Sequence, residues 1–434
     1  MGHQEVGSII SMPGNLYLQR YAYSRELISA PPHPDLSLVV VIPCYNEPDL
    51  LTSLQSLYDC NPPSGAVEVI VIINHSENSS SEVVEQNQST FESASRWTID
   101  HNEVQKQFHI LIVDPLPPKH AGVGLARKIG MDEAIRRFEQ LNRHDQGIIV
   151  CYDADCTCAP NYLRQIEVDF TNQQQATAAT IYFEHPLRGA LPQEIYEGIT
   201  NYELFLRYYR KALQYIGYPY PYYTVGSCLA IKARAYQKQG GMNRRQAGED
   251  FYFIEEHCRM GQIMEITGTT VYPSPRISNR VPFGTGKRQS QWITSKTKDF
   301  LTYHPKSFKL LRSFLVGIDS YFEMSDSKLD QFFKTLPSLL KSHLYAINAI
   351  NQISRCREQT KRLQSFRKCF FQWFDGLRVL QFLNHARAKY KDVSIGQAAT
   401  QMLNASHDLE LGNLPIDEQL KIYRKLDKGL NQIQ

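Results

Sequence analysis

The chain has 434 residues, of which 42% are hydrophobic and 21% charged, a composition typical of folded proteins rather than disordered ones. This length predicts two or three domains. The formal net charge is only +3, well below the basic excess of a typical nucleic-acid-binding module, so no nucleic-acid partner is expected.

Residues 1–36 predict an irregular N-terminal arm, because prolines cluster just before the first strong strand signal. Met1–Arg20 lacks the basic start and apolar core of a secretory signal. No apolar run approaches the roughly 20 residues that cross a bilayer. We therefore expect a cytoplasmic protein whose nine scattered cysteines are free thiols, with buried thiols favoured over zinc ligands.

Short apolar segments rich in Val and Ile alternate with helical stretches over residues 37–300. Such segments, apolar on both faces, are typical of parallel strands covered by helices. The alternation predicts an α/β layer fold with right-handed crossovers. The expected strands are 36–43, 67–73, 108–113, 147–152, 223–232 and 263–271, and the main helices between them are 125–141, 192–217 and 251–260.

The strand signals stop near residue 300, which predicts a third region, 301–434, built of amphipathic helices. The expected helices are 310–322, 328–353, 364–390 and 416–430. This region is basic, whereas the preceding part of the chain is mildly acidic.

The most informative short motif is Asp153-Ala-Asp155, directly after the strand expected at 147–152. In open α/β sheets, ligands bind beyond the carboxyl ends of the strands. Two neighbouring carboxylates repel each other unless a cation lies nearby, and Mg²⁺ and Mn²⁺ prefer oxygen ligands. The motif indicates a divalent metal site, with a turn that caps the next helix as the alternative.

Glu249-Asp250 opens the helix expected at 251–260. A carboxylate at this place is suited to accept a proton from a hydroxyl, which is the work of a general base. The alternative is purely structural, because negative charge stabilises a helix N-terminus.

Lys119–Gly130 combines small residues with Arg127 at a helix start. Its glycines lack the spacing of the dinucleotide fingerprint G-x-G-x-x-G. We therefore expect a helix start near an anion, with Arg127 reaching a phosphate.

Taken in order, these motifs resemble a family 2 glycosyltransferase of the GT-A fold, a nucleotide-diphospho-sugar transferase, over roughly residues 37–275. The resemblance implies a GT-A domain with a mainly parallel central sheet, to which the helical pattern adds a C-terminal helical domain. The segments that carry it are Val39-Val-Val-Ile-Pro-Cys-Tyr-Asn-Glu47, Ala126-Arg-Lys-Ile-Gly130, Asp153-Ala-Asp155, Val225-Gly-Ser227, Gly240-Gly-Met242 and Gly248-Glu-Asp250.

The resemblance implies transfer of a sugar, with inversion, from a UDP- or GDP-sugar to a hydroxyl of a saccharide or lipid-linked acceptor, as in polysaccharide biosynthesis. Asp155 is implied to bind Mg²⁺ or Mn²⁺, and Asp153 to hold the ribose and the edge of the metal. Asp250 is the implied general base, with Glu249 as the second candidate. The implied nucleotide-pocket residues are Pro43, Tyr45 and Glu47.

Two positions add to or depart from this pattern. Asn74 stands where the family has an aspartate that contacts the base; an amide also pairs with a base edge, which leaves the base open. His304 is a candidate third metal ligand, as in some related GT-A enzymes. A retaining transferase, a sugar nucleotidyltransferase and a non-catalytic binding protein on the same fold remain alternatives.

The basic residues of the C-terminal region allow two interpretations. Basic charge beside aromatic residues docks proteins on anionic lipid, which would place the protein at the inner face of a membrane. Alternatively, the region is a helical subdomain, and the aromatic residues of Phe370-Phe-Gln-Trp-Phe374 pack on the catalytic core. The basic residues concerned are Arg355, Arg357, Lys361, Arg362, Arg367 and Lys368.

Overall fold

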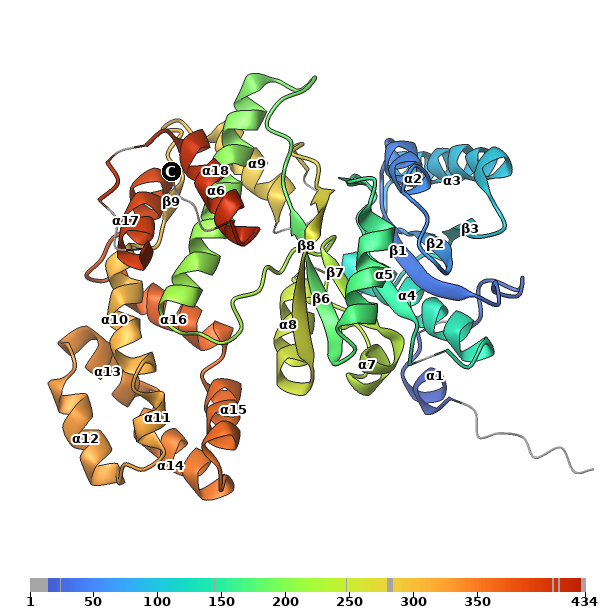
Figure 1. Cartoon of the computed structure of the whole chain (residues 1–434). Coiled ribbons are helices and arrows are strands. Elements are labelled where there is room, and N and C mark those ends of the chain that lie inside the picture. Colours follow the sequence, from blue (N-terminus) through green and yellow to red (C-terminus); the bar gives the residue numbers. More distant parts are fainter. Residues whose placement is uncertain are drawn as a thin grey trace, which may run out of the picture. The chain divides into compact units, whose positions relative to one another are not determined.

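The computed structural model describes residues 15–23, 25–143, 145–246, 248–278, 284–407, 410–412 and 414–430. The contacts divide the chain into two compact units (Figure 1). Unit 1 comprises the residues up to Ala179 together with Gly226–Glu249, and unit 2 comprises Thr180–Val225 together with the residues from Asp250 on. The expected boundaries near 36 and 300 stay a prediction.

Eight strands of the described residues form one mostly parallel sheet in the order β3-β2-β1-β4-β7-β6-β8-β5. Strand β1 pairs in parallel with β2 and β4, and β2 pairs in parallel with β3, whereas β4 and β7 are antiparallel. The strands are β1 Leu36–Cys44, β2 Ala66–Ile73, β3 Lys106–Ile112, β4 Ile148–Cys151, β5 Thr157–Cys158, β6 Ala176–Phe183, β7 Leu229–Lys232 and β8 Gln262–Tyr272.

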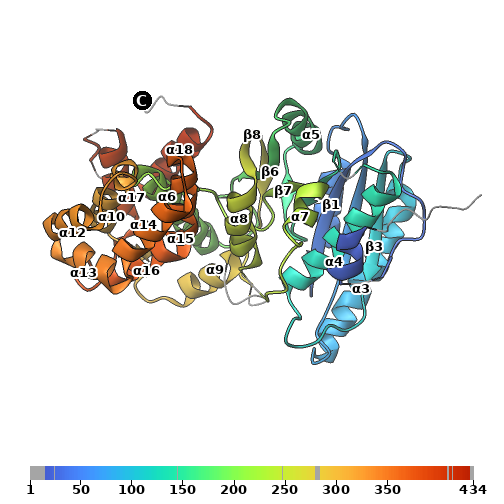
Figure 2. The same ribbon diagram turned by 90° about the horizontal axis from the view of Figure 1, so that it is seen from below.

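The expected α/β fold is confirmed, and its reason lies in the composition of the strands. Strand β2 is buried along its whole length, and β1 nearly so, because Val, Ile and Leu side chains fill both faces of the sheet. Helices α2 and α3 lie on one side of these strands and α4 on the other (Figures 1 and 2). The helices of unit 1 are α1 Leu16–Arg20, α2 Leu50–Tyr58, α3 Ser81–His101, α4 Val123–Gln140, α5 Tyr162–Asn172 and α7 Ala233–Lys238.

Two strand predictions need correction. Strand β6, Ala176–Phe183, was not expected, because its alanine-rich sequence carries neither clear alternation nor a run of β-branched residues. The strand expected at 223–232 covers only the last residues, Leu229–Lys232. The tyrosines and prolines just before it remain in irregular backbone.

Gly130 allows α4 to pack directly on the sheet. A Cβ atom at this position would lie 2.4 Å from Val41 Cγ1 and 3.2 Å from Ile72 Cγ1. We expect Gly130→Ala to lower the free energy of unfolding by about 1–3 kcal/mol, the usual cost of overpacking. Urea denaturation measures this loss. Gly412→Ala is the control, since a Cβ there meets no atom within 4 Å; equal stability losses for both variants would contradict the packing argument.

Unit 2 carries most of the helices. They are α6 Gln193–Tyr215, α8 Glu249–Met260 (which begins on the last residue of unit 1), α9 Thr285–Thr294, α10 Pro305–Leu315, α11 Ile318–Tyr321, α12 Asp326–Thr335, α13 Ser338–Ala346, α14 Ala349–Gln359, α15 Leu363–Trp373, α16 Gly376–Ala386, α17 Ile395–His407 and α18 Ile416–Asp427. Two short strands, β9 Leu301–Thr302 and β10 Val393–Ser394, pair antiparallel. No helix in the described parts of the chain is both long and apolar enough to span a membrane.

The long helices expected at 328–353 and 364–390 are each broken. Pro337 is the N-cap of α13, and Asn348 has a positive φ of 53° just before α14. Asp375 separates α15 from α16 and caps α16 by accepting a hydrogen bond from the Arg378 amide. Single residues that end or start a helix therefore divide each long amphipathic stretch into shorter helices.

The aromatic residues of the C-terminal region pack inside it. Phe370 and Phe374 are fully buried, and both belong to a continuous hydrophobic core that α6 shares with the later helices. These side chains therefore pack in the interior of unit 2, in a core that includes residues of α6. Of the expected basic cluster, Arg357 pairs with Asp326 and Arg367 with Asp319.

A buried ionic network ties α18 to α6 in unit 2. The Glu203 carboxylate is fully buried and accepts hydrogen bonds from Arg207 Nε at 2.9 Å and Arg424 Nε at 2.7 Å. The backbone amide of His185 donates to the same carboxylate at 2.7 Å. Burial alone raises the pKa of a carboxyl, but Arg207, His185 and Arg424 hold the pKa of Glu203 well below its usual range.

This depressed pKa predicts an acid dependence of stability. The ionised Glu203 stabilises unit 2 fully above the ordinary glutamate value of 4.5, and this contribution is lost as the pH falls toward the lower pKa of the folded state. We expect Glu203→Gln to cost about 3–5 kcal/mol at pH 7 and the difference from wild type to shrink below pH 4.5. Urea denaturation across pH tests this, with the exposed Glu197→Gln on the same helix as control. A difference that is independent of pH would contradict the assignment.

Candidate active site

The loop after β1 is fixed from two sides. Glu47 is completely buried, and its carboxylate accepts a hydrogen bond from the Asp49 amide at 3.0 Å. The backbone oxygen of Glu47 accepts a hydrogen bond from Thr90 of α3 at 2.8 Å. Pro43 and Tyr45 are partly exposed in the same segment. The loop therefore has a rigid base and offers partly exposed groups at the carboxyl end of β1.

Asn74 joins the ends of β1 and β2. Its Nδ2 donates to the Cys44 carbonyl at 2.9 Å, and its backbone oxygen accepts from Asn87 Nδ2 at 2.9 Å. Asn87 Oδ1 accepts from the amide of Asn46, whose φ is 48°. The Nδ2 atom of Asn74 therefore already has a partner within the protein. The contact with a nucleotide base stays a prediction, and Oδ1 is the atom that would make it.

The Asp153-Ala-Asp155 segment leaves β4 with alternating exposure. Ala154 and Cys156 are buried, at 6% and 1% exposure, whereas Asp153 and Asp155 are partly exposed. Ser53 Oγ of α2 lies 2.8 Å from the Ala154 carbonyl and 2.7 Å from the Cys156 carbonyl. Ser53 therefore holds the segment through its backbone, and both aspartates stay partly exposed.

Arg127 connects two of the predicted site residues. Its side chain is only 1% exposed; Nη2 donates to Asp153 Oδ1 at 2.7 Å, and Nη1 donates to the carboxylate of Glu249. Glu249 is itself 3% exposed. Arg127 therefore lies between two carboxylates. Contact with a phosphate, which the sequence suggested, stays a prediction.

Glycines make this arrangement possible. A Cβ at Gly226 would lie 2.8 Å from Arg127 Nη2, so only glycine leaves room for the guanidinium group. A Cβ at Gly124, in the first turn of α4, would lie 2.4 Å from the Arg245 carbonyl, and one at Gly122 would lie 2.7 Å from Gln246 Cα. These close approaches explain why small residues precede Arg127 and occur again at the Val225-Gly-Ser227 segment.

The neighbouring Lys128 has a structural contact. It is 3% exposed, and its Nζ lies 3.0 Å from Tyr17 Oη and 3.1 Å from Asp132 Oδ2. Tyr17 belongs to α1 and donates to Asp132 at 2.6 Å. Lys128 therefore fixes the described part of the N-terminal arm to α4.

Asp250 is the second residue of α8, and its Oδ1 accepts a hydrogen bond from the Phe251 amide at 2.7 Å. It is partly exposed, in contrast to its buried neighbour Glu249. Within unit 2, Asp250 lies near Tyr202: burial is the main cause that raises the pKa of Tyr202 to about 12, with Arg288 opposing and Asp250 adding to the rise. The helix N-terminus stabilises the ionised form of this carboxylate, which is the form that can accept a proton.

His304 caps α10. Its Nδ1 accepts a hydrogen bond from the Lys306 amide at 3.1 Å, and burial lowers its pKa. It belongs to unit 2, whereas Asp153 and Asp155 belong to unit 1. Its expected role as a metal ligand stays a prediction.

The donor atoms at Asp153 and Asp155 fit a hard divalent cation. Both residues offer partly exposed carboxylate oxygens, which Mg²⁺ and Mn²⁺ prefer. Across the described ranges, no three His, Cys, Asp or Glu side chains gather into a metal site. One or two carboxylates shared with substrate phosphates and water are the usual surroundings of Mg²⁺, so the pair fits a cation held together with a substrate.

Residues 39–239 match the model of the family described as Glycosyl transferase family 2. Over these residues the chain is a family 2 glycosyltransferase domain. The expected family and enzyme class are thereby confirmed. The matched range includes Asp153 and Asp155 and ends before Glu249 and Asp250.

No match to the chain was found among curated proteins. Among solved structures, the chain is similar to S. aureus TarS 1-349 in complex with UDP-GlcNAc, at 12% identity and a TM-score of 0.38, over 92% of this chain and 93% of that chain. It is also similar to the mannosyltransferase PcManGT from Pyrobaculum calidifontis in complex with GDP-Man and Mn²⁺, at 15% identity and a TM-score of 0.36, over 94% of this chain and 85% of that chain.

Two groups that position the site were not identified from the sequence. Asn87 and Thr90 of α3 are buried and hold the loops after β1 and β2. Their signal is a polar stripe at helical spacing on the buried face of α3, which ends in Ala94. Ser53 is the second group: it is a buried hydroxyl on the otherwise apolar inner face of α2. In both cases a buried polar group needs a polar partner, and that partner is a loop of the site.

Proposed function

We propose that the glycosyltransferase domain moves a sugar from a nucleotide-diphospho-sugar to an acceptor hydroxyl, with inversion at the anomeric carbon. The observation that supports it is the Asp153-Ala-Asp155 segment, fixed at the carboxyl end of β4 by Ser53 and Arg127 within the matched family range. A UDP- or GDP-sugar is the donor and a saccharide or a lipid-linked saccharide the acceptor.

The donor binds at the carboxyl ends of β1, β2 and β4 in this proposal. Pro43, Tyr45 and Asn74 contact the nucleoside, and the buried Glu47 keeps their loop in shape. Asp153 contacts the ribose. Arg127 sets the orientation of the Asp153 side chain and also forms an ion pair with Glu249. Arg127 therefore acts on the donor through Asp153.

Asp155, with Asp153 beside it, would hold Mg²⁺ or Mn²⁺ together with the diphosphate of the donor. When bound, such a cation supplies positive charge that offsets the charge developing on the leaving nucleoside diphosphate. Asp250 accepts the proton of the acceptor hydroxyl as that oxygen attacks the anomeric carbon from the face opposite the leaving group. Glu249 is the weaker candidate for this step, because it is buried and paired with Arg127.

The test measures donor binding and turnover. We expect Asp155→Asn to weaken Mn²⁺-dependent binding of UDP- or GDP-sugars at least about tenfold, since it removes one ligand charge. Calorimetry with and without Mn²⁺ measures this effect, and Asp100→Asn, an exposed position at the end of α3, is the control. Unchanged Mn²⁺-dependent binding in Asp155→Asn would contradict the metal role.

Product analysis separates the remaining alternatives. NMR of the new glycosidic bond distinguishes inversion, which we expect, from retention. Release of pyrophosphate instead of a nucleoside diphosphate would indicate a sugar nucleotidyltransferase. If no nucleotide sugar binds at all, a non-catalytic binding protein would be favoured.

Contact with a membrane is a proposal supported by exposed basic side chains alone. Arg355, Lys361, Arg362 and Lys368 are exposed on or beside α14 and α15, whereas the aromatic residues beside them are packed in the core. Sedimentation with anionic liposomes at low and high salt tests whether these charges bind lipid.

A further inference from the structure

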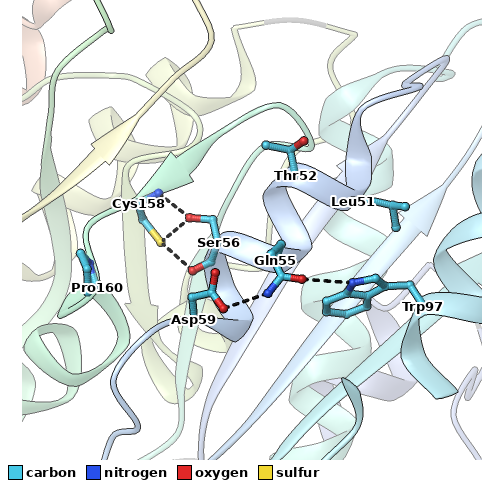
Figure 3. Close-up of a pocket in the computed structure, with 8 residues that line it drawn as sticks. All are labelled: Leu51, Thr52, Gln55, Ser56, Asp59, Trp97, Cys158 and Pro160. Carbon is cyan, nitrogen blue, oxygen red and sulfur yellow. Dashed lines mark hydrogen bonds between the residues drawn. The ribbon is translucent and has the colours of Figure 1, made fainter. Parts of the chain in front are cut away.

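A hollow on the outer side of α2 in unit 1 lies apart from the residues assigned to the donor. It has a volume of about 590 Å³, and Figure 3 shows that α2, Trp97 and the Cys158–Pro160 segment surround it. Trp97 Nε1 donates to Gln55 at 3.3 Å, and Gln55 in turn donates to Asp59 at 2.8 Å. The lining residues are Leu51, Thr52, Gln55, Ser56, Asp59, Trp97, Cys158 and Pro160.

Cys158 places a thiol group in this hollow, and the thiol group of Cys60 lies next to it. Cys158 is partly exposed, whereas Cys60 is only 3% exposed. The two Sγ atoms are 3.5 Å apart. A disulfide bond is about 2.05 Å long, so the two atoms need to approach by only about 1.5 Å.

Neighbouring groups favour the thiolate at Cys158. Ser56 Oγ lies 3.5 Å from Cys158 Sγ, and its oxygen also accepts a hydrogen bond from the Cys158 amide at 2.9 Å (Figure 3). Hydrogen bonds from Cys60 first, and then from Ser56, lower the pKa of Cys158 against the effect of burial. The same contact with Cys158, together with burial, raises the pKa of Cys60. The Lys106 ammonium group lies 3.1 Å from the Cys60 carbonyl and places positive charge beside the pair.

We infer that Cys158 and Cys60 form a thiol–disulfide pair in which Cys158 reacts with a small disulfide that enters the hollow and Cys60 resolves the adduct. The Cys158 thiolate attacks one sulfur of the small disulfide and forms a mixed disulfide, and the other half leaves as a thiolate. Cys60 then loses its proton and attacks Cys158 Sγ, which forms the internal disulfide and releases the second half as a thiol. Two protein thiols are oxidised and one small disulfide is reduced to two thiols.

The pair borders the segment that carries the two aspartates. Ser53, Ser56 and Cys60 lie on one face of α2 or at its end, and they contact Ala154, Cys156 and Cys158. Cys158 follows Asp155 by three residues. An internal disulfide would therefore fasten this segment to the end of α2. The inference goes beyond the proposed transfer and does not depend on it.

The test exposes the full chain to oxidised glutathione and follows it by intact mass and peptide mapping. A second thiol pair, Cys356 and Cys369, has Sγ atoms 2.7 Å apart, so every variant carries Cys369→Ser to keep that pair silent. The parent protein carries Cys369→Ser alone. We expect it to lose two hydrogens and to yield a linked Cys60–Cys158 peptide. Cys60→Ser should accumulate a glutathione adduct at Cys158, and Cys158→Ser should form no adduct at Cys60. Cys258→Ser, at a buried thiol in unit 2, should behave as the parent does.

The inference is overturned if Cys60→Ser carries no adduct at Cys158, or if the parent keeps the adduct as long as Cys60→Ser does. A second measurement needs no variant at these cysteines. In the native wild type, we expect iodoacetamide to label Cys158 at least about tenfold faster than the buried Cys156, because only Cys158 combines access with thiolate character. Equal labelling rates would also overturn the inference.

Discussion

Replacing Arg127 by methionine is expected to lower the free energy of unfolding by about 3–5 kcal/mol, because it leaves a buried carboxylate without its partner. Arg127 is 1% exposed and pairs with Glu249, which is 3% exposed, and with the partly exposed Asp153. Methionine has a similar volume and fills the space beside Gly226, so the main loss is electrostatic. Urea denaturation followed by circular dichroism measures it.

Two further variants decide whether this charge argument holds. Arg234→Met removes an arginine of the same unit that pairs with Asp145 at the surface, where both side chains are more than half exposed; its expected cost is within about 1 kcal/mol. Adding Glu249→Gln to Arg127→Met should recover part of the stability, since the buried charge disappears. Equal losses in Arg127→Met and Arg234→Met would contradict the assignment.

Arg127→Lys separates charge from geometry. Lysine keeps the positive charge but cannot donate to two carboxylates in the fixed fork of a guanidinium group. We expect intermediate stability and a weaker hold on Asp153. In the proposed function this variant therefore weakens donor binding through Asp153.

Asp250→Asn is expected to lower kcat by about 10²–10⁴-fold, the usual contribution of a general base. The amide has nearly the same shape, but it does not take up the proton of the acceptor hydroxyl. Donor binding should remain unchanged, because Asp250 contacts the acceptor in the proposal. Transfer assays at saturating donor and acceptor, together with calorimetry of donor binding, measure the two quantities separately.

The choice of Asp250 over Glu249 also has a direct comparison. Glu256→Gln changes an exposed carboxylate on the same helix and should leave kcat unaltered. Glu249→Gln removes the partner of Arg127 and should reduce stability together with activity. Full turnover in Asp250→Asn, with normal turnover in Glu256→Gln, would rule out Asp250 as the base.

The sequence by itself determined the α/β class, the positions of the first four strands and the motifs at their ends. Strands β1 and β2 are recognisable because parallel strands buried on both faces need runs of Val, Ile and Leu. The Asp153-Ala-Asp155 motif stands out because two neighbouring carboxylates after a buried strand repel each other unless a cation lies nearby, although a capping turn has the same sequence pattern. These are local signals, which depend on neighbours in the chain.

The tertiary structure alone decided which of these side chains contact one another. Arg127 lies buried between Asp153 and Glu249, residues 26 and 122 positions away, and its sequence motif does not predict this pairing. The support by Asn87 and Ser53, the approach of Cys60 to Cys158 and the short helices of unit 2 were likewise invisible in the chain. Each depends on the packing of segments that are distant in sequence, or on single residues that interrupt a helix. The periodicity of hydrophobic side chains predicts neither of these.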